Sequence, residues 1–273
     1  MSATSAYVMG HDDRERRRLA LQGSILNPFT EHLLRRAGIS AGMRVLDIGC
    51  GVGDVSLLAA RIVGRGGRVT SLDFDGQALK ILKERANAEV LGNIECVEGN
   101  VHDWNSELRF DAVIGRHILI HSKNPLDVLQ RSAGMLQPRG LAVFHEYDFS
   151  VMHRAWPPAP LHDRTMEVFD RFFEVACFSN MGSRLWTLLL DAGFENPDCR
   201  AEYPIDGGPD SLHFEWFVES LRSILPRAIA LGIVSEGEIG IDTLEERLRA
   251  ENRATRSCIP APAMIGAFAR LKG

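Results

Sequence analysis

The sequence lacks the marks of secreted, zinc-binding and membrane-spanning proteins. Its five cysteines form no C-x-x-C pair, which argues against a zinc signature or a disulfide framework and favours buried free thiols. No stretch approaches the ~18 consecutive apolar residues of a membrane-spanning helix. The N-terminus has no apolar core of a signal peptide either. We therefore expect a cytoplasmic protein that makes no membrane contact.

An excess of basic residues is also missing. The net charge is −5, and because residues 1–150 carry equal numbers of acidic and basic groups, residues 151–273 carry the whole imbalance. A nucleic-acid-binding protein needs the opposite sign. The one basic cluster, Arg14 to Arg18, is interleaved with acidic residues, which is typical of the solvated face of a helix. Nucleic acid is therefore not an expected partner.

Glycine, in contrast, is concentrated in one short turn. Apolar residues flank Asp47 as in a buried strand, and an apolar helical run begins at Val55. Between them glycine occupies every second position, at Gly49, Gly51 and Gly53. Glycine is needed where a backbone bends sharply and lets a ligand reach its amides, and the following helix presents free N–H groups. The stretch predicts a strand, a ligand-binding turn and a helix.

The glycine spacing separates two nucleotide-binding families. The dinucleotide fingerprint G-x-G-x-x-G requires glycine at position 54, where this chain has Asp54. The stretch instead resembles motif I of the class I S-adenosylmethionine (SAM)-dependent methyltransferases, D-x-G-x-G-x-G, with Asp47, Gly49, Gly51 and Gly53 in place. The resemblance implies that this turn holds the methionine part of SAM, the predicted cofactor. A tight turn without a ligand is the alternative.

Strands and helices alternate after this motif. Further strands are expected at 68–72, 93–98, 110–115 and 140–146, with helices at 55–63, 75–92 and from 124. Near-continuous apolar strands separated by helices indicate an α/β fold with a parallel sheet, in which ligands bind at the carboxyl ends of the strands.

Asp73 closes the second of these strands, 20 positions after Gly53. A carboxylate at this place can accept hydrogen bonds from both ribose hydroxyls of a nucleoside. Capping of the following turn is the alternative. Its neighbour Phe74 packs either on an adenine face or in the core.

The third strand leads into the loop Gly99–Trp104, which resembles the adenine-reading loop of the methyltransferases. The resemblance implies that Asn100 and Val101 contact the adenine amino group and ring nitrogen. Many family members have Asp at the position of Asn100, but an Asn carbonyl can still accept a hydrogen bond from an amine.

The turn after the fourth strand carries three further candidates. In the family this turn lies beside the SAM methionine and the reacting methyl, which implies cofactor contact for Arg116 and makes His117 or His121 the candidate catalytic base. The two histidines, at i and i+4, are expected to share a helix face. That spacing also suits a metal, but no third ligand is in sight, so no metal is predicted. A purely structural histidine pair is the alternative.

The fifth strand ends in polar residues. Because strand side chains alternate, His145 is expected to point to the face opposite Glu146.

The family resemblance is firmest over residues 40–150, the SAM-binding core. It implies a Rossmann-like, doubly wound sheet of seven strands, completed by residues 184–205 and 258–273, with the last strand antiparallel. Residues 1–39 are expected to hold N-terminal helices. One of these should cover 27–38, with Asn27 as N-cap and Pro28 at the first helical position.

Two helical insertions, residues 151–183 and 206–257, are expected to form a cap. With no internal repeats or low-complexity linkers, 1–273 is predicted to be a single methyltransferase domain. The cap carries aromatic residues at helical spacing that are either core or part of an acceptor pocket: Phe172, Phe173, Trp216 and Phe217. A cap over the strand ends would create a closed, mostly apolar pocket for a small-molecule acceptor. Adjacent Phe172 and Phe173 are expected to divide between core and pocket.

The function that these features predict is methyl transfer from SAM to an oxygen or carbon of a small, largely apolar metabolite. An NAD(P)-dependent oxidoreductase is one alternative, disfavoured by Asp54 and by the lack of an evident Tyr-x-x-x-Lys pair. A non-catalytic SAM-binding protein is another. A homodimer is compatible with the sequence.

Overall fold

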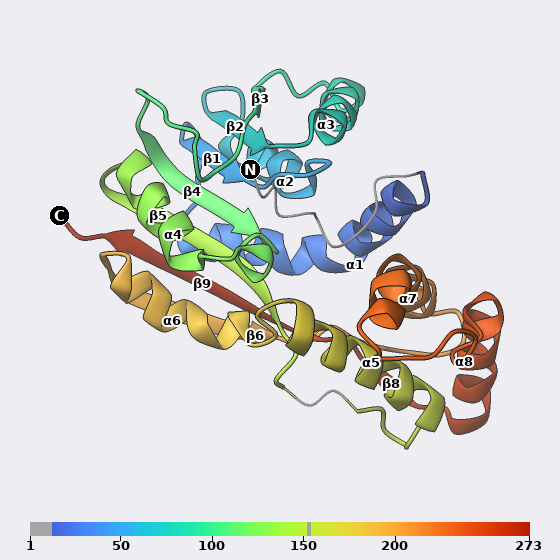
Figure 1. Cartoon of the computed structure of the whole chain (residues 1–273). Helices are drawn as coiled ribbons and strands as arrows, with labels where there is room; N and C mark the ends of the chain where they lie inside the picture. The colour runs from blue at the N-terminus through green and yellow to red at the C-terminus, as the bar shows by residue number, and fades with distance from the viewer. Residues whose placement is uncertain (1–12, 152–153) are drawn as a thin grey trace. The chain divides into compact units, whose positions relative to one another are not determined.

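The structure is a computed structural model that describes residues 13–151 and 154–273 (Figure 1). Its contacts divide the chain into two compact units. The sheet unit consists of Leu26–Glu146, Met181–Glu202 and Ile265–Gly273. The cap unit consists of Tyr147–Asn180 and Tyr203–Met264, with the described residues up to Ile25. The organisation of 1–273 as a single domain stays a prediction.

A seven-stranded sheet with the order β3-β2-β1-β4-β5-β9-β6 forms the centre of the sheet unit. The strands are β1 (Arg44–Ile48), β2 (Arg68–Asp73), β3 (Ile94–Glu98), β4 (Phe110–Arg116), β5 (Leu136–Asp148), β6 (Phe194–Glu202) and β9 (Ala263–Leu271). Strands β1 to β5 pair in parallel. Strand β9 runs antiparallel, as its arrow shows in Figure 1. The predicted seven-stranded fold is confirmed.

The sheet brings the ends of β1, β2 and β4 together. Strand β1 lies between β2 and β4, which is where the strand order reverses. Ile48 at the end of β1 pairs with Leu72, and Asp47 pairs with Ile114 of β4. The glycine turn therefore begins beside the last residues of two neighbouring strands, where ligands bind in open α/β sheets.

The sheet unit contains several helices, two of which begin at a capping side chain. The helices are α2 (Asp54–Val63), α3 (Gly76–Ala88), α4 (Pro125–Met135) and α6 (Met181–Asp191), with one 3₁₀ turn, η1 (Leu119–His121). Asp75 caps α3 by accepting a hydrogen bond from the backbone N–H of Gln77 at 2.8 Å. Asn124 caps α4 in the same way. Local side-chain oxygens thus satisfy helix N–H groups that have no partner within the helix.

The N-terminal helix differs from the prediction. A single helix, α1 (Asp13–Ala37), contains Pro28 in its interior, so the predicted start at Asn27 is wrong. The side-chain oxygen of Asn27 accepts a hydrogen bond from Nη1 of Arg116 at 3.0 Å instead of capping the helix. Burial of Leu26 and Leu34 on either side of the proline favours continuation of the helix.

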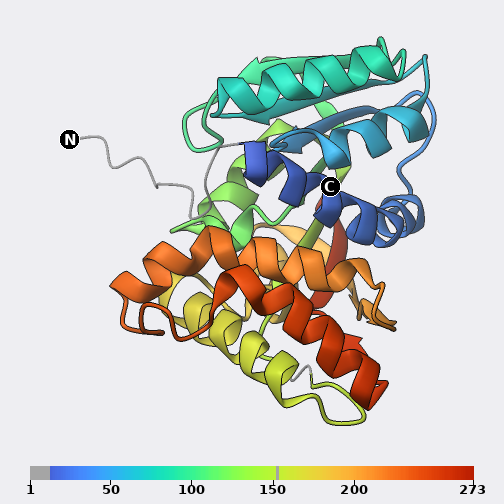
Figure 2. The ribbon, with the colours of Figure 1, turned by 90° about the vertical axis from the view of Figure 1, so that its right-hand side faces the viewer.

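In the described residues, the cap unit contains three main helices and a short antiparallel sheet of two strands. Its helices are α5 (Pro160–Ala176), α7 (Leu212–Ala230) and α8 (Ile241–Thr255), and its strands are β7 (Ile205–Gly207) and β8 (Cys258–Pro260). Figure 2 shows α7 and α5 on either side of α8. Ion pairs from Arg14 to Glu219 and from Arg17 to Glu215 join the first turns of α1 to α7.

Aromatic side chains fill the interior of the cap unit. Phe172 and Phe173 are both buried, and the Phe173 ring stacks on Phe149 with the ring centroids 4.1 Å apart. Their burial gives no support to the predicted division of this pair between core and pocket. None of the helices in the described ranges has the length and apolar character that crossing a membrane requires.

The cysteines only partly follow the prediction. All five are free, but Cys50 alone is buried, and Cys258 is exposed. The expectation of buried thiols is therefore wrong for the other four. Burial of Cys50 in the glycine turn raises the pKa of its thiol, so this side chain behaves as a small apolar group.

Candidate functional site

The three glycines of the turn all have left-handed backbones, with φ values of 64° at Gly49, 52° at Gly51 and 89° at Gly53. A Cβ atom at Gly49 would collide with Ile118, and one at Gly53 would collide with Leu82. A Cβ atom at Gly51 would meet no described atom within 4 Å. Packing therefore requires glycine at the two outer positions. The middle position opens onto free space, as the predicted approach of SAM to this turn needs.

Asp47 lies beneath this turn. Its carboxylate accepts a hydrogen bond from the Ser56 hydroxyl at 2.6 Å, and Ser71 donates to Ser56 at 2.8 Å. Burial raises the pKa of Asp47 to about 7. These contacts fasten the first turns of α2 to β1 and β2. They give Asp47 a role in holding the turn, and its predicted contact with SAM stays a prediction.

Asp73 reaches the turn from the neighbouring strand. One carboxylate oxygen accepts from the N–H of Gly51 at 2.7 Å, and the other accepts from the N–H of Asp75 at 2.9 Å. The turn-capping alternative is therefore present in the structure. Each oxygen retains a further lone pair, so capping and ribose binding are compatible.

Phe74, the next residue, has 54% of its surface exposed. This exposure excludes the core alternative that the sequence left open for Phe74. An exposed ring beside Asp73 provides an apolar face on which adenine could stack. Adenine contact itself stays a prediction.

The loop after β3 is held in a compact conformation. The side-chain oxygen of Asn100 accepts from the N–H of His102 at 3.0 Å, and Val101 is buried. His102 Nδ1 lies 2.7 Å from a carboxylate oxygen of Asp127 in α4, which also pairs with Arg131. The hydrogen bond with His102 lowers the pKa of Asp127. A hydrogen bond between His102 and Asp127, which the sequence did not reveal, thus anchors the loop predicted to read adenine.

Arg116 is occupied by protein groups. Its Nη1 donates to the side-chain oxygens of Asn27 and Thr30 at 3.0 and 2.9 Å, and its Nη2 lies 3.6 Å from Asp54. Asp54 also accepts from Arg85 at 2.7 Å. The Arg116 side chain is only 5% exposed. These contacts join α1, α2, α3 and β4, so they favour a structural role, and contact between Arg116 and SAM stays a prediction.

His117 and His121 do not share a helix face, so that prediction is wrong. His117 has a left-handed backbone with a φ of 56°, and its N–H donates to the carbonyl of His145 at 3.0 Å. The 3₁₀ turn begins only at Leu119 and ends at His121. Both histidines nevertheless belong to the short segment that follows β4.

Glu146 on β5 fixes this segment. Its buried carboxyl group accepts from the N–H groups of Ile118, Leu119 and Ile120 at 3.0, 2.9 and 3.2 Å. His145 has a different partner, because its Nδ1 lies 3.1 Å from the hydroxyl oxygen of Thr30. The two neighbouring side chains thus point to opposite faces of the strand, as expected. Burial raises the pKa of Glu146 to about 8, although the three N–H groups oppose the shift.

The raised pKa of Glu146 predicts a pH-dependent stability. Between the ordinary value of 4.5 and about 8, the folded chain keeps a proton that the unfolded chain has lost. The free energy of unfolding should therefore fall as pH rises from 5 to 8, by roughly 2–4 kcal/mol from this one group. In a Glu146→Gln variant that part of the fall should be missing. Urea unfolding of the wild type and the variant at pH 5 and 8 measures this change in the free energy of unfolding. Asp47, whose pKa is also raised, adds the same pH dependence to both proteins and cancels in the comparison.

If the free energy of unfolding depended on pH in the same way in the wild type and in Glu146→Gln, Glu146 would not have the raised pKa that its burial predicts.

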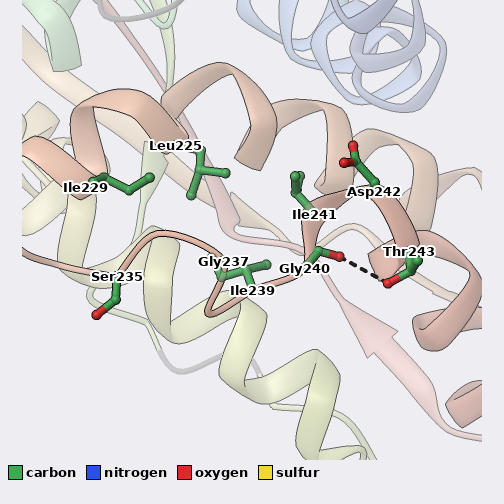
Figure 3. Close-up of a pocket in the computed structure, with 9 residues that line it drawn as sticks. All are labelled: Leu225, Ile229, Ser235, Gly237, Ile239, Gly240, Ile241, Asp242 and Thr243. Atoms are coloured by element: carbon green, nitrogen blue, oxygen red, sulfur yellow. Dashed lines mark hydrogen bonds between the residues drawn. The ribbon is translucent and has the colours of Figure 1, made fainter.

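A hollow of about 210 Å³ lies in the cap unit between α7 and the start of α8 (Figure 3). Its polar lining residues are exposed, and Thr243 donates to the carbonyl of Gly240. Asp242 pairs with Arg222 at 2.7 Å. The hollow therefore gives no sign of a polar ligand. Among the described residues, no three His, Cys, Asp or Glu side chains are placed to hold a metal ion.

Comparisons with known proteins find methyltransferases that are similar to part of the chain. A demethylmenaquinone methyltransferase of Geobacillus kaustophilus is 30% identical over 42% of the chain and 50% of that protein. A mitochondrial ubiquinone biosynthesis O-methyltransferase of Schizosaccharomyces pombe is 29% identical over 50% of each protein. The chain thus spans about half the length of the curated relatives it matches.

A solved structure and a family model match larger parts of the chain than these two relatives do. The crystal structure of a SAM-dependent methyltransferase from Aquifex aeolicus has a TM-score of 0.54 and 15% identity, over 96% of this chain and all of that one. This likeness shows the fold. The family model described as methyltransferase domain matches residues 39–188, more than half of the chain. The glycine turn at the strand-order reversal, the seven-stranded sheet and this match agree, and the chain belongs to the class I SAM-dependent methyltransferase family.

Proposed function

We propose that the chain transfers a methyl group from SAM to an oxygen or carbon atom of a small, largely apolar metabolite. The observation that carries the proposal is Gly51, whose left-handed backbone opens onto free space while its N–H is held by Asp73. That arrangement fits a ligand lying directly against the turn. The oxidoreductase alternative has no support from the family match, which is to methyltransferases.

The cofactor would be held along the ends of β1 to β3. The glycine turn would hold the methionine part, Asp73 the ribose and the exposed ring of Phe74 one adenine face. Asn100 and Val101 would read the adenine edge, in a loop that the pair between His102 and Asp127 keeps in place.

Bound SAM supplies a methyl group that is already electrophilic. The chain's own task is then to align the acceptor and exclude water, and alignment alone contributes up to ~7–11 kcal/mol in favourable cases. A hydroxyl acceptor must also lose a proton. His121 or His117 would take it, and Glu146 would fix the backbone of the segment between them.

The acceptor that we propose is a phenolic ring, methylated on a hydroxyl oxygen or on an activated ring carbon. One relative is named a demethylmenaquinone methyltransferase, and another is named a ubiquinone biosynthesis O-methyltransferase. The aromatic interior of the cap unit is compatible with such a ring.

Asp73→Ala should weaken SAM binding by roughly 1.5–3 kcal/mol, the scale of hydrogen bonds that involve a charged group. The variant loses the predicted ribose contacts and also frees the N–H of Gly51. Calorimetric titration with SAM and a thermal melt measure the two effects. Lost stability with unchanged affinity would leave turn capping as the only role of Asp73.

The function itself is tested with methyl-labelled SAM and a panel of acceptors. The purified full chain is incubated with simple phenols, naphthalene diols, aliphatic alcohols and amines, and the methylated atom is identified by mass spectrometry. Transfer to phenolic oxygen or ring carbon supports the proposal. SAM binding without transfer to any member would favour a non-catalytic SAM-binding protein, and hydride transfer from NAD(P)H without SAM binding would revive the oxidoreductase.

A further inference from the structure

We propose that the buried face of α7 contains a recognition site for the oxygen substituent of an aromatic acceptor, formed by His213, Trp216 and Ser220. This inference rests on the proposed function for its choice of acceptor, and all three residues belong to the cap unit. They occupy positions i, i+3 and i+7 and therefore lie on one face of the helix. Their exposed fractions are 4%, 4% and 8%.

The site has aromatic walls. The His213 ring lies 5.8 Å from Trp216 and 5.6 Å from Phe217, measured between centroids. On α5, the His162 ring lies 5.7 Å from Phe217. Rings from two cap helices therefore gather around Phe217, beside this face of α7, and a planar aromatic ligand is the kind that packs against such rings.

Three polar atoms on this face have no hydrogen-bond partner in the described part of the chain: His213 Nδ1, Trp216 Nε1 and Ser220 Oγ. The His213 ring also donates to the carbonyl of Ile259. Because Nδ1 is the nitrogen without a partner, Nε2 carries the hydrogen and Nδ1 is an acceptor. Burial lowers the pKa of His213, which favours this neutral form.

Two other buried hydroxyls of the cap unit have partners: Thr165 donates to the carbonyl of Leu161 at 2.8 Å, and Ser211 donates to Asp206 at 2.6 Å. The side-chain oxygen of Asn252 on α8 also lacks a partner in the described part of the chain, but the α7 face holds three such atoms together. A buried polar atom without a partner costs about 1–3 kcal/mol. Three such atoms on one helix face are therefore better explained by a ligand that supplies their partners than by packing alone.

The atoms define the ligand chemistry. His213 Nδ1 accepts a hydrogen bond, Trp216 Nε1 donates one, and the Ser220 hydroxyl does either. A phenol matches this set, since its hydroxyl donates to Nδ1 while its oxygen accepts from Nε1. None of the three groups carries a charge in this form, so the set recognises a neutral oxygen substituent and gives no counter-ion to a carboxylate or an ammonium group.

The experiment compares two probes that differ by one hydroxyl group, 1-naphthol and naphthalene, by equilibrium dialysis against the full chain with and without SAM. The variants are Ser220→Ala and Trp216→Phe. The first removes only the hydroxyl group, and the second removes the indole N–H and keeps an aromatic ring. Matched controls are Ser132→Ala, a buried helix serine that donates to the carbonyl of Val128, and Trp186→Phe on the exposed side of α6.

The wild-type chain should bind 1-naphthol more tightly than naphthalene. Each α7 variant should lower 1-naphthol affinity about 3- to 10-fold, the effect of one hydrogen bond, and leave naphthalene affinity unchanged. Ser220→Ala should leave the melting temperature unchanged or raise it, because it removes a buried hydroxyl without a partner. The two control variants should keep the wild-type preference for 1-naphthol.

Equal binding of the two probes, no binding of 1-naphthol, or α7 variants that keep the preference would overturn the inference. The proposed function is measured separately by SAM titration and methyl transfer. Methyl transfer with an unaltered probe preference in the variants would refute the α7 site alone. A preference that depends on α7, in a chain that transfers no methyl group to any acceptor, would refute the proposed function alone.

Discussion

Gly51→Val should produce a folded protein that no longer binds SAM. The added side chain meets no described atom within 4 Å, so the fold has space for it. The backbone at Gly51 has a φ of 52°, and a β-branched residue there costs of order 1–3 kcal/mol of strain. That cost is smaller than the 5–15 kcal/mol stability of a typical domain. The branched side chain fills the space through which SAM must approach the turn, so calorimetric titration should show no binding.

Two other glycines provide controls for this experiment. Gly232 also has a left-handed backbone and open space around its Cβ position, but it lies at the end of α7. Gly232→Val should therefore cost similar strain and leave SAM affinity unchanged. Gly53→Ala should lower the melting temperature, because the new Cβ collides with Leu82. Wild-type affinity in a folded Gly51→Val variant would mean that the turn does not hold the cofactor.

The parts of the fold that the sequence predicted depend on contacts close in the chain. Strand β2 was expected at 68–72 and is found at Arg68–Asp73, because an apolar run ends at a polar turn. Asp75 caps α3 through a residue only two positions away. Strands β6 and β9 are different, since they join the sheet far from their sequence neighbours. Their places came from the family resemblance.

The predictions that failed concern segments that distant residues hold. Asn27 was expected to cap a helix, but its side chain is bound by Arg116, 89 residues away. The segment after β4 was expected to be helical, but Glu146 binds three of its N–H groups from 26 to 28 residues away. Local pattern cannot reveal such contacts, because nothing in the neighbouring sequence marks which distant carboxylate or guanidinium will arrive.

Glu146 fixes the backbone between His117 and His121, so either histidine could be held in place as the catalytic base. If one of them is the catalytic base, its loss should lower kcat by about 10²–10⁴-fold with a phenolic acceptor, while SAM affinity changes little. The substitution that we favour is His→Gln in each, because glutamine keeps hydrogen-bonding atoms but cannot take the proton. His32, exposed and paired with Glu202 at 3.1 Å, provides the control substitution.

The pH dependence of kcat/KM separates a base from a structural histidine. A base must be neutral to act, so the wild-type rate should rise with pH through the pKa of the base and then level off. Removing the base should abolish this rise, whereas removing a structural histidine should lower the melting temperature and leave the shape of the profile intact. We expect one of His117→Gln and His121→Gln to behave in the first way. Two variants that both keep the wild-type profile would make the pair structural, and methyl transfer would then depend on alignment alone or on a base outside this segment.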